Sequence, residues 1–337
     1  MATIKDVAKL AGVAVSTASY ALNNSGLVSS DTRKKVLDAA RRLNYQPSGI
    51  ARDLKSNKTN TVGLILPDLS GPFYSELIKG IQDVTIANGY DLIAVSSIGG
   101  KNSTAAKFLK EKRADGVIIL ASNIDENLIS DAARKDMPVV LLDKRIEAEY
   151  VLNIQVDNEG GAYKAVEHLV SLGRNEIAYL SGPSNSFDNS KRFEGYKKAL
   201  RDHGIPFSGH LLYQGNFTKE GGNHAAKLML LQNRLPEAIF AANDEMAIGA
   251  MEVLKQAGIN IGQEIAIVGF DDIQLAEYVQ PPLTTIRQPM REMGSLAAQQ
   301  IFRALNGDFS SNFILLETEL IIRESCGGKQ LNKQMPR

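Results

Sequence analysis

The feature that most constrains this chain is a pair of short amphipathic segments at its N-terminus, joined by a glycine. Residues 4–10 carry apolar side chains at helical spacing. Thr3 precedes them with Asp6 three residues on, the arrangement of a capping box at a helix start. Gly12 supplies a tight turn, and residues 13–24 (VAVSTASYALNN) continue with a second apolar-periodic stretch. Two helices joined in this way form a helix-turn-helix, whose second helix can lie in the major groove of DNA.

A third segment completes the N-terminal pattern. Ser29 can cap a helix that runs through Val36 to Leu43, and Pro47 ends that run before a different stretch, residues 48–56. The outward face of the second helix carries small, hydroxylated or amphipathic side chains and no charge, which suits close approach to DNA. Taken alone, that helix could also be a solvated surface helix.

The first sixty residues are basic, although the whole chain has no net charge. They hold ten Lys or Arg residues against four acidic residues, a balance of +6. The remainder holds 28 basic and 34 acidic residues, a balance of −6. A basic head on an acidic body is typical of a nucleic-acid-binding domain attached to a domain with another role.

The chain resembles the lactose-repressor (LacI/GalR) family of bacterial transcription regulators along essentially its whole length. The resemblance lies in TIKDVAKLAGVAVSTASYALN, in VSSDTRKKVLDAARRLNYQPSGIARDLKS, and later in GFDD followed by PPLTTIRQP. It implies a homodimeric repressor that binds a pseudo-palindromic operator in double-stranded DNA and responds to a small molecule. It also implies dimer contacts on residues 73–88, 246–257 and 275–282.

Within the second helix, we expect Val15, Ser16 and Tyr20 to reach base edges, because they lie on the exposed face near its start and middle. Tyr20 departs from the Arg or His often found there in the family, so a bidentate guanine contact is not expected. Contacts with the DNA backbone are expected from polar side chains of the head: Thr3, Thr17, Ser19, Asn23 and Arg33.

Residues 47–59 are expected to form a hinge. Pro47 can start a helix, yet Ser48 and Gly49 make so short an isolated helix unstable in water, so we expect disorder without DNA. In the family, the paired hinges of a dimer form helices on the operator, and an apolar side chain wedges into the minor groove. The matching side chains here are Ile50, Ala51, Leu54 and Lys55. A flexible charged tether is the alternative.

From residue 60 onward, apolar runs alternate with helical stretches. Runs that are apolar on both faces suit parallel strands covered by helices. Strands are expected at residues 62–66, 91–95, 117–120, 139–142, 177–180, 238–241, 265–270 and 313–322. Helices are expected at residues 73–88, 104–112, 160–172, 190–203, 219–231, 244–257 and 291–305. Two doubly wound α/β halves follow from this order.

The predicted architecture is therefore an all-α helix-turn-helix head and an α/β core of two doubly wound, Rossmann-like subdomains. By family resemblance the core is periplasmic-binding-protein-like, with the tail crossing back between the halves. The head is assigned residues 1–46, the hinge 47–59 and the core 60–337. The subdomains are assigned residues 60–159 with 290–318, and 160–289 with 319–330. Residues 331–337 are expected to be a disordered tail.

Polar side chains follow nearly every expected strand of the core, where ligands bind in open parallel sheets. Each could instead cap the helix that follows, as Asp244 could by itself. Together with nearby aromatic residues, the set favours a cleft for a small polyhydroxylated ligand. The expected effector-binding residues are Asp68, Phe73, Tyr74, Ser122, Asp143, Asp188, Arg192, Phe217, Asn243, Asp271 and Gln288.

The family resemblance implies roles for several of these residues. Arg192 falls on the arginine that commonly anchors the effector, and Asn243 and Asp271 fall on the amide and carboxylate that complete the site. Phe217 falls on the stacking aromatic residue, and Asp143 on a hydroxyl-binding acid. An arginine with opposed carboxylates can pair with vicinal hydroxyls or a carboxylate, which favours a sugar or sugar derivative.

Other functions fit the sequence less well. A purine or nucleoside effector is less favoured because residues 184–191 depart from purine-binding relatives around Ser186 and Asp188. A protein partner could also control the regulator in place of a cleft ligand. A plain solute-binding protein would be secreted and would lack the basic head.

No enzyme motif of the GxGxxG, GxxxxGK[ST], GxSxG or HExxH type occurs in the sequence. The four histidines have no metal-ligand spacing: His168, His203, His210 and His224. We therefore expect neither an enzyme nor a bound metal or cofactor.

The cellular compartment is indicated by what the sequence contains. Cys326 is the single cysteine of the 337 residues, so no disulfide can form within the chain. Neither an N-terminal apolar signal stretch nor an apolar run of about eighteen residues is present. These observations predict a cytoplasmic protein without a membrane segment.

Overall fold

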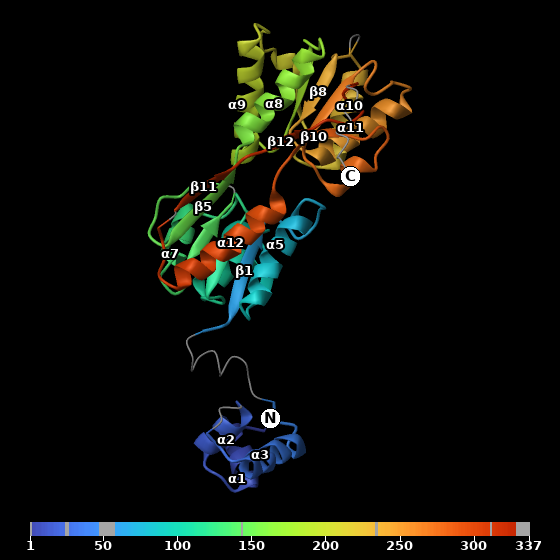
Figure 1. Ribbon diagram of the computed structural model, residues 1–337. Coiled ribbons are helices and arrows are strands. Elements are labelled where there is room, and N and C mark those ends of the chain that lie inside the picture. The colour runs from blue at the N-terminus through green and yellow to red at the C-terminus, as the bar shows by residue number, and fades with distance from the viewer. Residues whose placement is uncertain are drawn as a thin grey trace, which may run out of the picture. The chain divides into compact units, whose positions relative to one another are not determined.

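The computed structural model describes residues 2–23, 27–46, 58–142, 144–232, 235–310 and 312–327. The chain forms two compact units, residues 1–59 and residues 60–337 (Figure 1). No helix within the described ranges is long and apolar enough to cross a membrane. The expectations for residues 47–57, for Asp143 and for the C-terminal tail fall outside the described residues.

The N-terminal unit contains the three expected helices, α1 (Ile4–Ala11), α2 (Val15–Leu22) and α3 (Ser30–Arg42). Thr3 and Asp6 form the capping box: the Asp6 N–H donates to Thr3 Oγ1 at 3.4 Å, and the Thr3 N–H donates to Asp6 Oδ2 at 2.8 Å. Gly12 ends α1 at a φ of +66°, a left-handed conformation that glycine adopts without strain. The predicted helix-turn-helix is confirmed.

A small apolar core holds these helices together. Val7 of α1, Ala18 and Ala21 of α2, and Val36 of α3 are buried against one another, with other residues of the head packed around them. Alanine in α2 lets the helices approach closely, because its side chain ends at Cβ. The face of α2 that is left over consequently points away from this core.

The first sheet of the core unit is six-stranded and entirely parallel, in the order β11-β5-β4-β3-β1-β2. Its strands are β1 (Thr61–Leu66), β2 (Asp91–Ser96), β3 (Gly116–Ile119), β4 (Val139–Leu141), β5 (Val151–Val156) and β11 (Phe313–Leu316). Its helices are α5 (Tyr74–Ala87), α6 (Thr104–Lys110), α7 (Glu126–Ala132) and α12 (Met290–Leu305). All six residues of β1 are buried, as a parallel strand covered on both faces requires.

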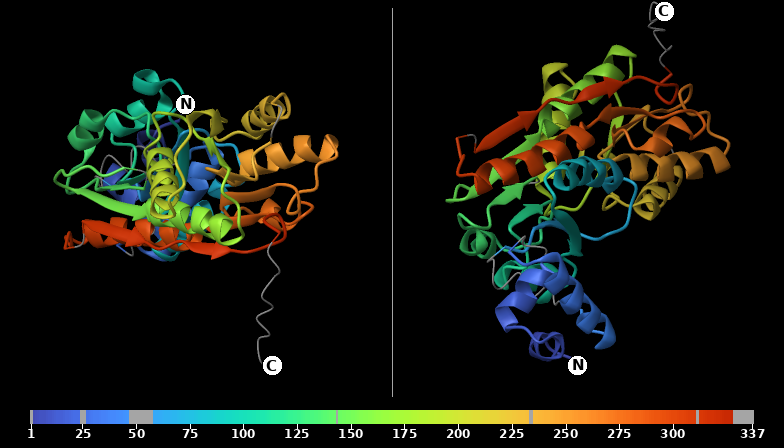
Figure 2. Two further views of the ribbon diagram at one scale, coloured as in Figure 1. Left: turned by 90° about the horizontal axis from the view of Figure 1, so that it is seen from above. Right: turned by 60° about the horizontal axis from the view of Figure 1, so that its bottom comes forward.

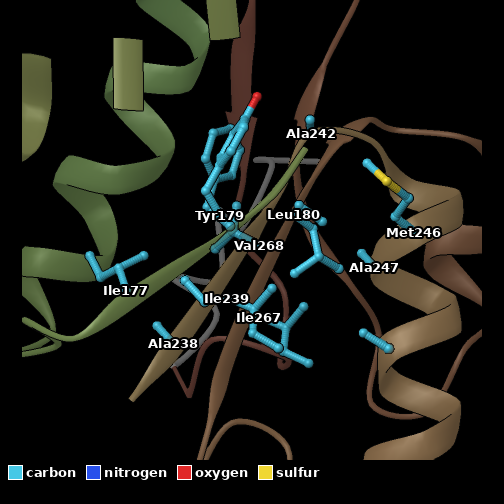
Figure 3. Packing of buried hydrophobic residues seen from close by; sticks show 14 of the residues in the cluster. Ile177, Tyr179, Leu180, Ala238, Ile239, Ala242, Met246, Ala247, Ile267 and Val268 are labelled. Carbon is cyan, nitrogen blue, oxygen red and sulfur yellow. The ribbon is translucent and has the colours of Figure 1, made fainter. Parts of the chain in front are cut away.

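The second sheet has the order β12-β10-β9-β8-β6-β7, parallel except that β12 is antiparallel to β10. Its strands are β6 (Ile177–Ser181), β7 (Leu212–Gln214), β8 (Ala238–Ala241), β9 (Ala266–Asp271), β10 (Thr284–Arg287) and β12 (Glu319–Ile321). Its helices are α8 (Asn158–Ser171), α9 (Phe187–Asp202), α10 (Lys219–Leu230) and α11 (Asp244–Gln256). Figure 3 shows Ile177 and Tyr179 on one face of this sheet, and Leu180, Ile239 and Ile267 on the other face, toward Met246 and Ala247 of α11.

The chain crosses between the two halves three times. The crossings follow β5, at Asp157; β10, at Gln288 and Pro289; and β11, at Glu317 and Thr318. Figure 2 shows the red strands β11 and β12 running on from one half into the other. The periplasmic-binding-protein-like architecture of two α/β lobes is confirmed.

One expected strand is wrong. A single strand was predicted over residues 313–322, but the chain instead forms β11 and β12 in different sheets. Thr318 lies buried between them, where its Oγ1 donates to the Asp157 carbonyl at 3.3 Å, beside the first crossing. The apolar pattern runs on through both strands, so it cannot reveal the change of partner strand.

The strands β5, β7 and β10 were not expected from the sequence. In β5, the buried Asn153 interrupts the apolar run, and its side chain binds the backbone N–H of Ile146 at 2.9 Å. In β10, the buried Thr284 and Thr285 donate their hydroxyls to Cys326 Sγ and to the Asp244 carboxylate. These polar residues are satisfied by distant partners, which local apolar patterning does not show.

Helices α5 and α12 pack against each other through two glycines (Figure 1). A Cβ on Gly80 of α5 would lie 2.1 Å from the Arg291 carbonyl oxygen, and a Cβ on Gly294 of α12 would lie 2.3 Å from the Leu77 carbonyl oxygen. Both obstructing atoms belong to the backbone, so neither can rotate away. The helices are therefore in direct backbone contact.

We expect Gly80→Ala to lower the free energy of unfolding by about 1–3 kcal/mol, because the added methyl group forces the two helices apart. Helix propensity alone would give the opposite sign, a gain of about 1 kcal/mol. Urea unfolding followed by circular dichroism measures the difference. Gly209→Ala is the control: no atom lies within 4 Å of its added Cβ, and a change within about 0.5 kcal/mol is expected. A more stable Gly80→Ala protein would contradict the described contact.

Candidate functional site

The second helix of the head presents a polar, uncharged surface. Val15 and Tyr20 are 43% and 41% exposed, and Ser16 is exposed beside them, whereas Ala18 and Ala21 are buried on the opposite face. The three residues predicted to read bases thus share the outward side of α2. Side chains of this kind can accept or donate hydrogen bonds, or pack on a thymine methyl group, in a major groove.

The residues predicted to contact the DNA backbone have differing surroundings. Thr17 and Ser19 are partly buried, and Asn23 Nδ2 donates to Ser19 Oγ at 3.4 Å. Thr3 is exposed, and its hydroxyl also donates to Asp6 Oδ2 at 2.8 Å within the capping box. Arg33 is exposed in the first part of α3. The Thr3 hydroxyl would therefore have to serve the helix cap and a phosphate together.

The core unit contains a cavity of about 400 Å³ lined by both of its halves. Nine of the eleven residues predicted to bind an effector line it: Asp68, Phe73, Tyr74, Ser122, Asp188, Arg192, Phe217, Asn243 and Asp271. Gln288 does not line this cavity, but its Nε2 donates to Asp271 Oδ1 at 2.7 Å. Asp143 lies outside the described residues.

Arg192 is the most constrained of these side chains, being only 3% exposed. Its Nε donates to Asn158 Oδ1 at 2.8 Å, and its Nη1 donates to the Ala242 carbonyl and to Asp271 Oδ1, the latter at 3.4 Å. Its guanidinium carbon lies 3.9 Å from the Phe270 ring centroid. Nη2 has no hydrogen-bond partner among the described residues, so it remains available to a ligand in the cavity.

Two carboxylates surround this guanidinium. Burial raises the pKa of Asp271, and the positive charge of Arg192 opposes that rise. Burial likewise raises the pKa of Asp188, whose Oδ1 accepts from Asn158 Nδ2 at 2.9 Å. Asn158 therefore joins Asp188 to Arg192 by one hydrogen bond to each.

The backbone around the cavity is strained at several residues. Asp271 and Asp272 have φ values of +122° and +58°, and Asn216 and Phe217 have values of +54° and +62°. Such conformations cost free energy for residues other than glycine, and they concentrate at ligand sites. The tertiary structure thus fixes Asp271 and Phe217 in orientations that they would not adopt locally.

Phe217 can lie against the end of β6 because the residue there is glycine. A Cβ on Gly182 would lie 2.3 Å from the Phe217 ring. The Phe217 carbonyl accepts from Asn243 Nδ2 at 3.1 Å. Elsewhere in the lining, the rings of Phe73 and Tyr74 meet edge to face at 5.3 Å, and Phe187 is 36% exposed. Aromatic residues from both halves thus line the cavity.

The alternative interpretation of these polar residues as helix caps holds for Asn243, whose Oδ1 accepts from the Met246 N–H at 3.0 Å. The sequence suggested Asp244 as the N-cap of α11, and this interpretation is wrong because the N-cap is Asn243. Asp244 is fully buried and accepts from Thr285 Oγ1 at 2.5 Å and from the Ile273 N–H at 2.9 Å. Burial raises its pKa well above the ordinary value. Asn243 combines a capping role with a place in the cavity wall.

Three residues of the site were not predicted from the sequence: Asn158, Ser70 and Glu245. Asn158 follows β5, a strand that was not expected, so the rule about strand ends could not reach it. Ser70 donates through its N–H and Oγ to Asp68 Oδ1, at 2.7 and 2.6 Å, and lines the cavity. Glu245 lines it too, and its position directly after Asn243 and Asp244 was the available signal.

In the part of the chain that the structure describes, no group of three His, Cys, Asp or Glu side chains is placed to hold a metal ion. The cavity instead offers one guanidinium, several carboxylates, amides and hydroxyls, and aromatic surfaces. This combination suits reversible binding of a small polar molecule.

Two family models match the chain. Residues 3–48 match "Bacterial regulatory proteins, lacI family", and residues 59–320 match "Periplasmic binding proteins and sugar binding domain of LacI family". The chain is 37% identical over 336 residues to the HTH-type transcriptional repressor PurR of Photobacterium profundum, covering 98% of this chain and 100% of that protein. These matches span both units.

Solved structures agree with this likeness. The lac repressor dimer bound to operator and the anti-inducer ONPF is 30% identical, with a TM-score of 0.79 over 96% of this chain and 99% of that chain. A LacI family transcriptional regulator from Enterococcus faecium with bound ribose is 30% identical, with a TM-score of 0.71 over 79% of this chain and 98% of that chain. Each of these proteins is a transcription regulator.

We expect Arg192→Met to lower the free energy of unfolding by on the order of 3–5 kcal/mol, because it leaves the buried Asp271 without its cation. The loss should be smaller below neutral pH than above it, since protonation of Asp271 removes the buried charge. Denaturant titration of the single variant and of Arg192→Met with Asp271→Asn tests this. The double variant should recover much of the loss.

The control is Arg201→Met on the same helix, whose side chain is 73% exposed and which should change stability by no more than about 0.5 kcal/mol. A double variant no more stable than the single one would show that the unpaired carboxylate is not the source of the loss.

Proposed function

The chain belongs to the LacI family of bacterial transcription regulators, and from this we propose that it is a homodimeric repressor controlled by a small molecule in the core cavity. The helix-turn-helix head is the observation that carries the DNA-binding part of the proposal. The lined cavity between the halves carries the effector part. As a regulator of transcription it acts in the bacterial cytoplasm, where the chromosome lies.

A dimer is needed because one helix-turn-helix contacts too few base pairs for useful specificity. Two copies related by a two-fold axis read a pseudo-palindromic operator with half-sites about one helical turn apart. The proposed contact surfaces are α5, α11 and residues 275–282 of the core. Exposed apolar side chains support this choice: Ile86, Leu275 and Tyr278 are 65%, 48% and 68% exposed.

We propose that the exposed residues of the head fall into two groups, one that reads bases and one that contacts the DNA backbone. Val15, Ser16 and Tyr20 read base edges, and Thr3, Thr17, Ser19, Asn23 and Arg33 hold the DNA backbone. Phosphate contacts fix register, whereas base contacts select the sequence. Because α2 carries no charged residue, its specificity rests on neutral hydrogen bonds and apolar contacts.

We expect Tyr20→Ala to change the half-site selected from a randomised DNA pool without unfolding the head. Loss of one base contact costs about 1–3 kcal/mol at that base pair only. Selection followed by sequencing identifies the altered position, and circular dichroism checks the fold. Arg33→Ala on α3 is the control, expected to weaken binding to all sequences alike because it removes a contact with the DNA backbone. An unchanged preferred half-site for Tyr20→Ala would remove Tyr20 from base reading.

The favoured effector is a sugar or sugar derivative. Hydroxyls can pair with the free Nη2 of Arg192 and with the carboxylates of Asp188 and Asp271, while the apolar face of a sugar ring stacks on Phe217. Asp68, Phe73, Tyr74, Ser122, Asp143, Asn243 and Gln288 are proposed to complete or support the site. The relative that contains bound ribose supports this choice. A purine or nucleoside is the second candidate, because aromatic surfaces also suit a heterocyclic base.

The proposed coupling between cleft and operator runs through residues 47–59. Ile50, Ala51, Leu54 and Lys55 are proposed to enter the minor groove at the operator centre, with Leu54 as the wedge between base pairs. An effector that changes the spacing of the two attachment points in a dimer then shifts the DNA equilibrium. The effector needs no contact with DNA.

Fluorescence anisotropy on the selected operator, with a panel of sugars, purines and nucleosides, tests the whole proposal. One compound should shift operator affinity of the wild-type protein by about 5–150-fold, the usual range of coupling. Phe217→Ala should lose that shift through lost ligand affinity. Leu54→Ala should bind the compound normally by calorimetry and yet lose operator affinity and bending. Normal bending by Leu54→Ala would overturn the wedge, and no response to any compound would favour control by a protein partner.

A further inference from the structure

The cavity wall is strongly acidic. Among the described residues that line it, four are carboxylates, Asp68, Asp188, Glu245 and Asp271, and one is a cation, Arg192. Lys191 does not line the cavity; its Nζ lies 6.0 Å from the centroid of the Phe187 ring and 2.6 Å from Glu194 Oε2. The electrostatic potential inside the cavity is therefore set mainly by carboxylates.

The charge of Arg192 does not offset this imbalance. Its guanidinium is paired with Asp271 and the Ala242 carbonyl, and it is stacked on Phe270. Asp271 is thereby paired in place, whereas Asp68, Asp188 and Glu245 form no ion pair with any described residue. What Arg192 still offers a ligand is the hydrogen-bonding capacity of Nη2, not an uncompensated positive charge.

Glu245 is the least satisfied of these carboxylates. It is half-buried, and no hydrogen bond or ion pair joins its carboxylate to any described residue. It extends from the start of α11 toward the opposite half, since a Cβ on Gly71 would lie 3.5 Å from its Oε1. Burial, with the neighbouring charges of Glu220 and Asp68, raises its pKa. An acceptor in this state gains from a donor supplied by a ligand.

We propose that this cavity selects uncharged or amino-bearing polyols and rejects phosphorylated or carboxylated ones, with Glu245 binding a hydroxyl or ammonium group of the ligand. This inference rests on the proposed effector role of the cavity. A phosphate ester would bring its negative charge among carboxylates that have no spare cation. A hydroxyl or ammonium group would instead meet acceptors already in place.

The charge of the cavity can be measured without knowing the effector. Ser122→Cys places a thiol in its wall, where Ser122 is exposed and makes no described hydrogen bond, while the native Cys326 is 1% exposed. Two methanethiosulfonate reagents, one bearing a trimethylammonium group and one a sulfonate, modify that thiol. The ratio of their rates, normalised to free 2-mercaptoethanol, reports the local potential.

We expect the cationic reagent to be favoured by about tenfold in Ser122→Cys and by much less in Ser171→Cys on the surface of α8. Adding Glu245→Gln should lower the cavity ratio by about threefold. Adding Glu167→Gln, which removes the same charge from the outer surface of α8, should leave it unchanged. A cavity ratio equal to the surface ratio would overturn the inference, and an effect of Glu245→Gln no larger than that of Glu167→Gln would remove Glu245 from it.

Calorimetry with matched compounds is the second arm, using glucose, glucosamine and glucose 6-phosphate, and ribose with ribose 5-phosphate. The phosphate esters should bind at least about tenfold more weakly than their parents. Tighter binding of either ester would overturn the inference. Binding of none of these compounds would count against the proposed sugar effector, while the thiol ratio would still decide the charge selectivity.

Discussion

The three chain crossings between the two sheets constrain everything else in the core unit. Parallel strands place their carboxyl ends at one edge of a sheet, and the crossings hold the two such edges on either side of one cavity. For this reason Asp68 of the first half lines the same cavity as Arg192 and Asp271 of the second half. The topology thus determines where the cavity lies, and the side chains at the strand ends determine what it can bind.

Placing ionisable side chains in this buried site costs free energy, which the surrounding fold offsets. Arg192, Asp188, Asp244 and Asp271 are charged or ionisable groups shielded from water, and a buried charge without a partner is strongly destabilising. Arg192, Asp244 and Asp271 each have hydrogen-bond partners from more than one segment, and Asp188 accepts a hydrogen bond from Asn158. The positive φ values of Asp271 and Phe217 add local strain at the same place. The burial of apolar side chains in the two flanking cores must offset this free-energy cost.

Sequence patterns anticipate the parts of this protein that depend on neighbours in the chain. The Thr3 capping box, the turn at Gly12 and the cap at Ser29 are local interactions, and all three occur as expected. Strands such as β5 and β10 escaped because Asn153, Thr284 and Thr285 find their partners in distant segments. Asn158 was not predicted because it follows β5, which was not predicted either. Glu245 was not predicted because its surroundings depend on distant residues such as Asp68 and Glu220. Local rules thus describe the head well and the polar centre of the core less completely.

The position of Gln288 links the ligand cavity to the connection between the two halves. This residue belongs to the second crossing, between the last residue of β10 and the start of α12, and its amide holds the carboxylate of Asp271. A ligand that binds Asp271 would therefore act, through Gln288, on the crossing between the two halves and not on one half alone. Helix α12 follows this crossing and is in direct backbone contact with α5 at Gly80 and Gly294, a contact that resists movement of one helix against the other. A displacement of the Asp271 carboxylate would thus reach the first half through Gln288 and α12.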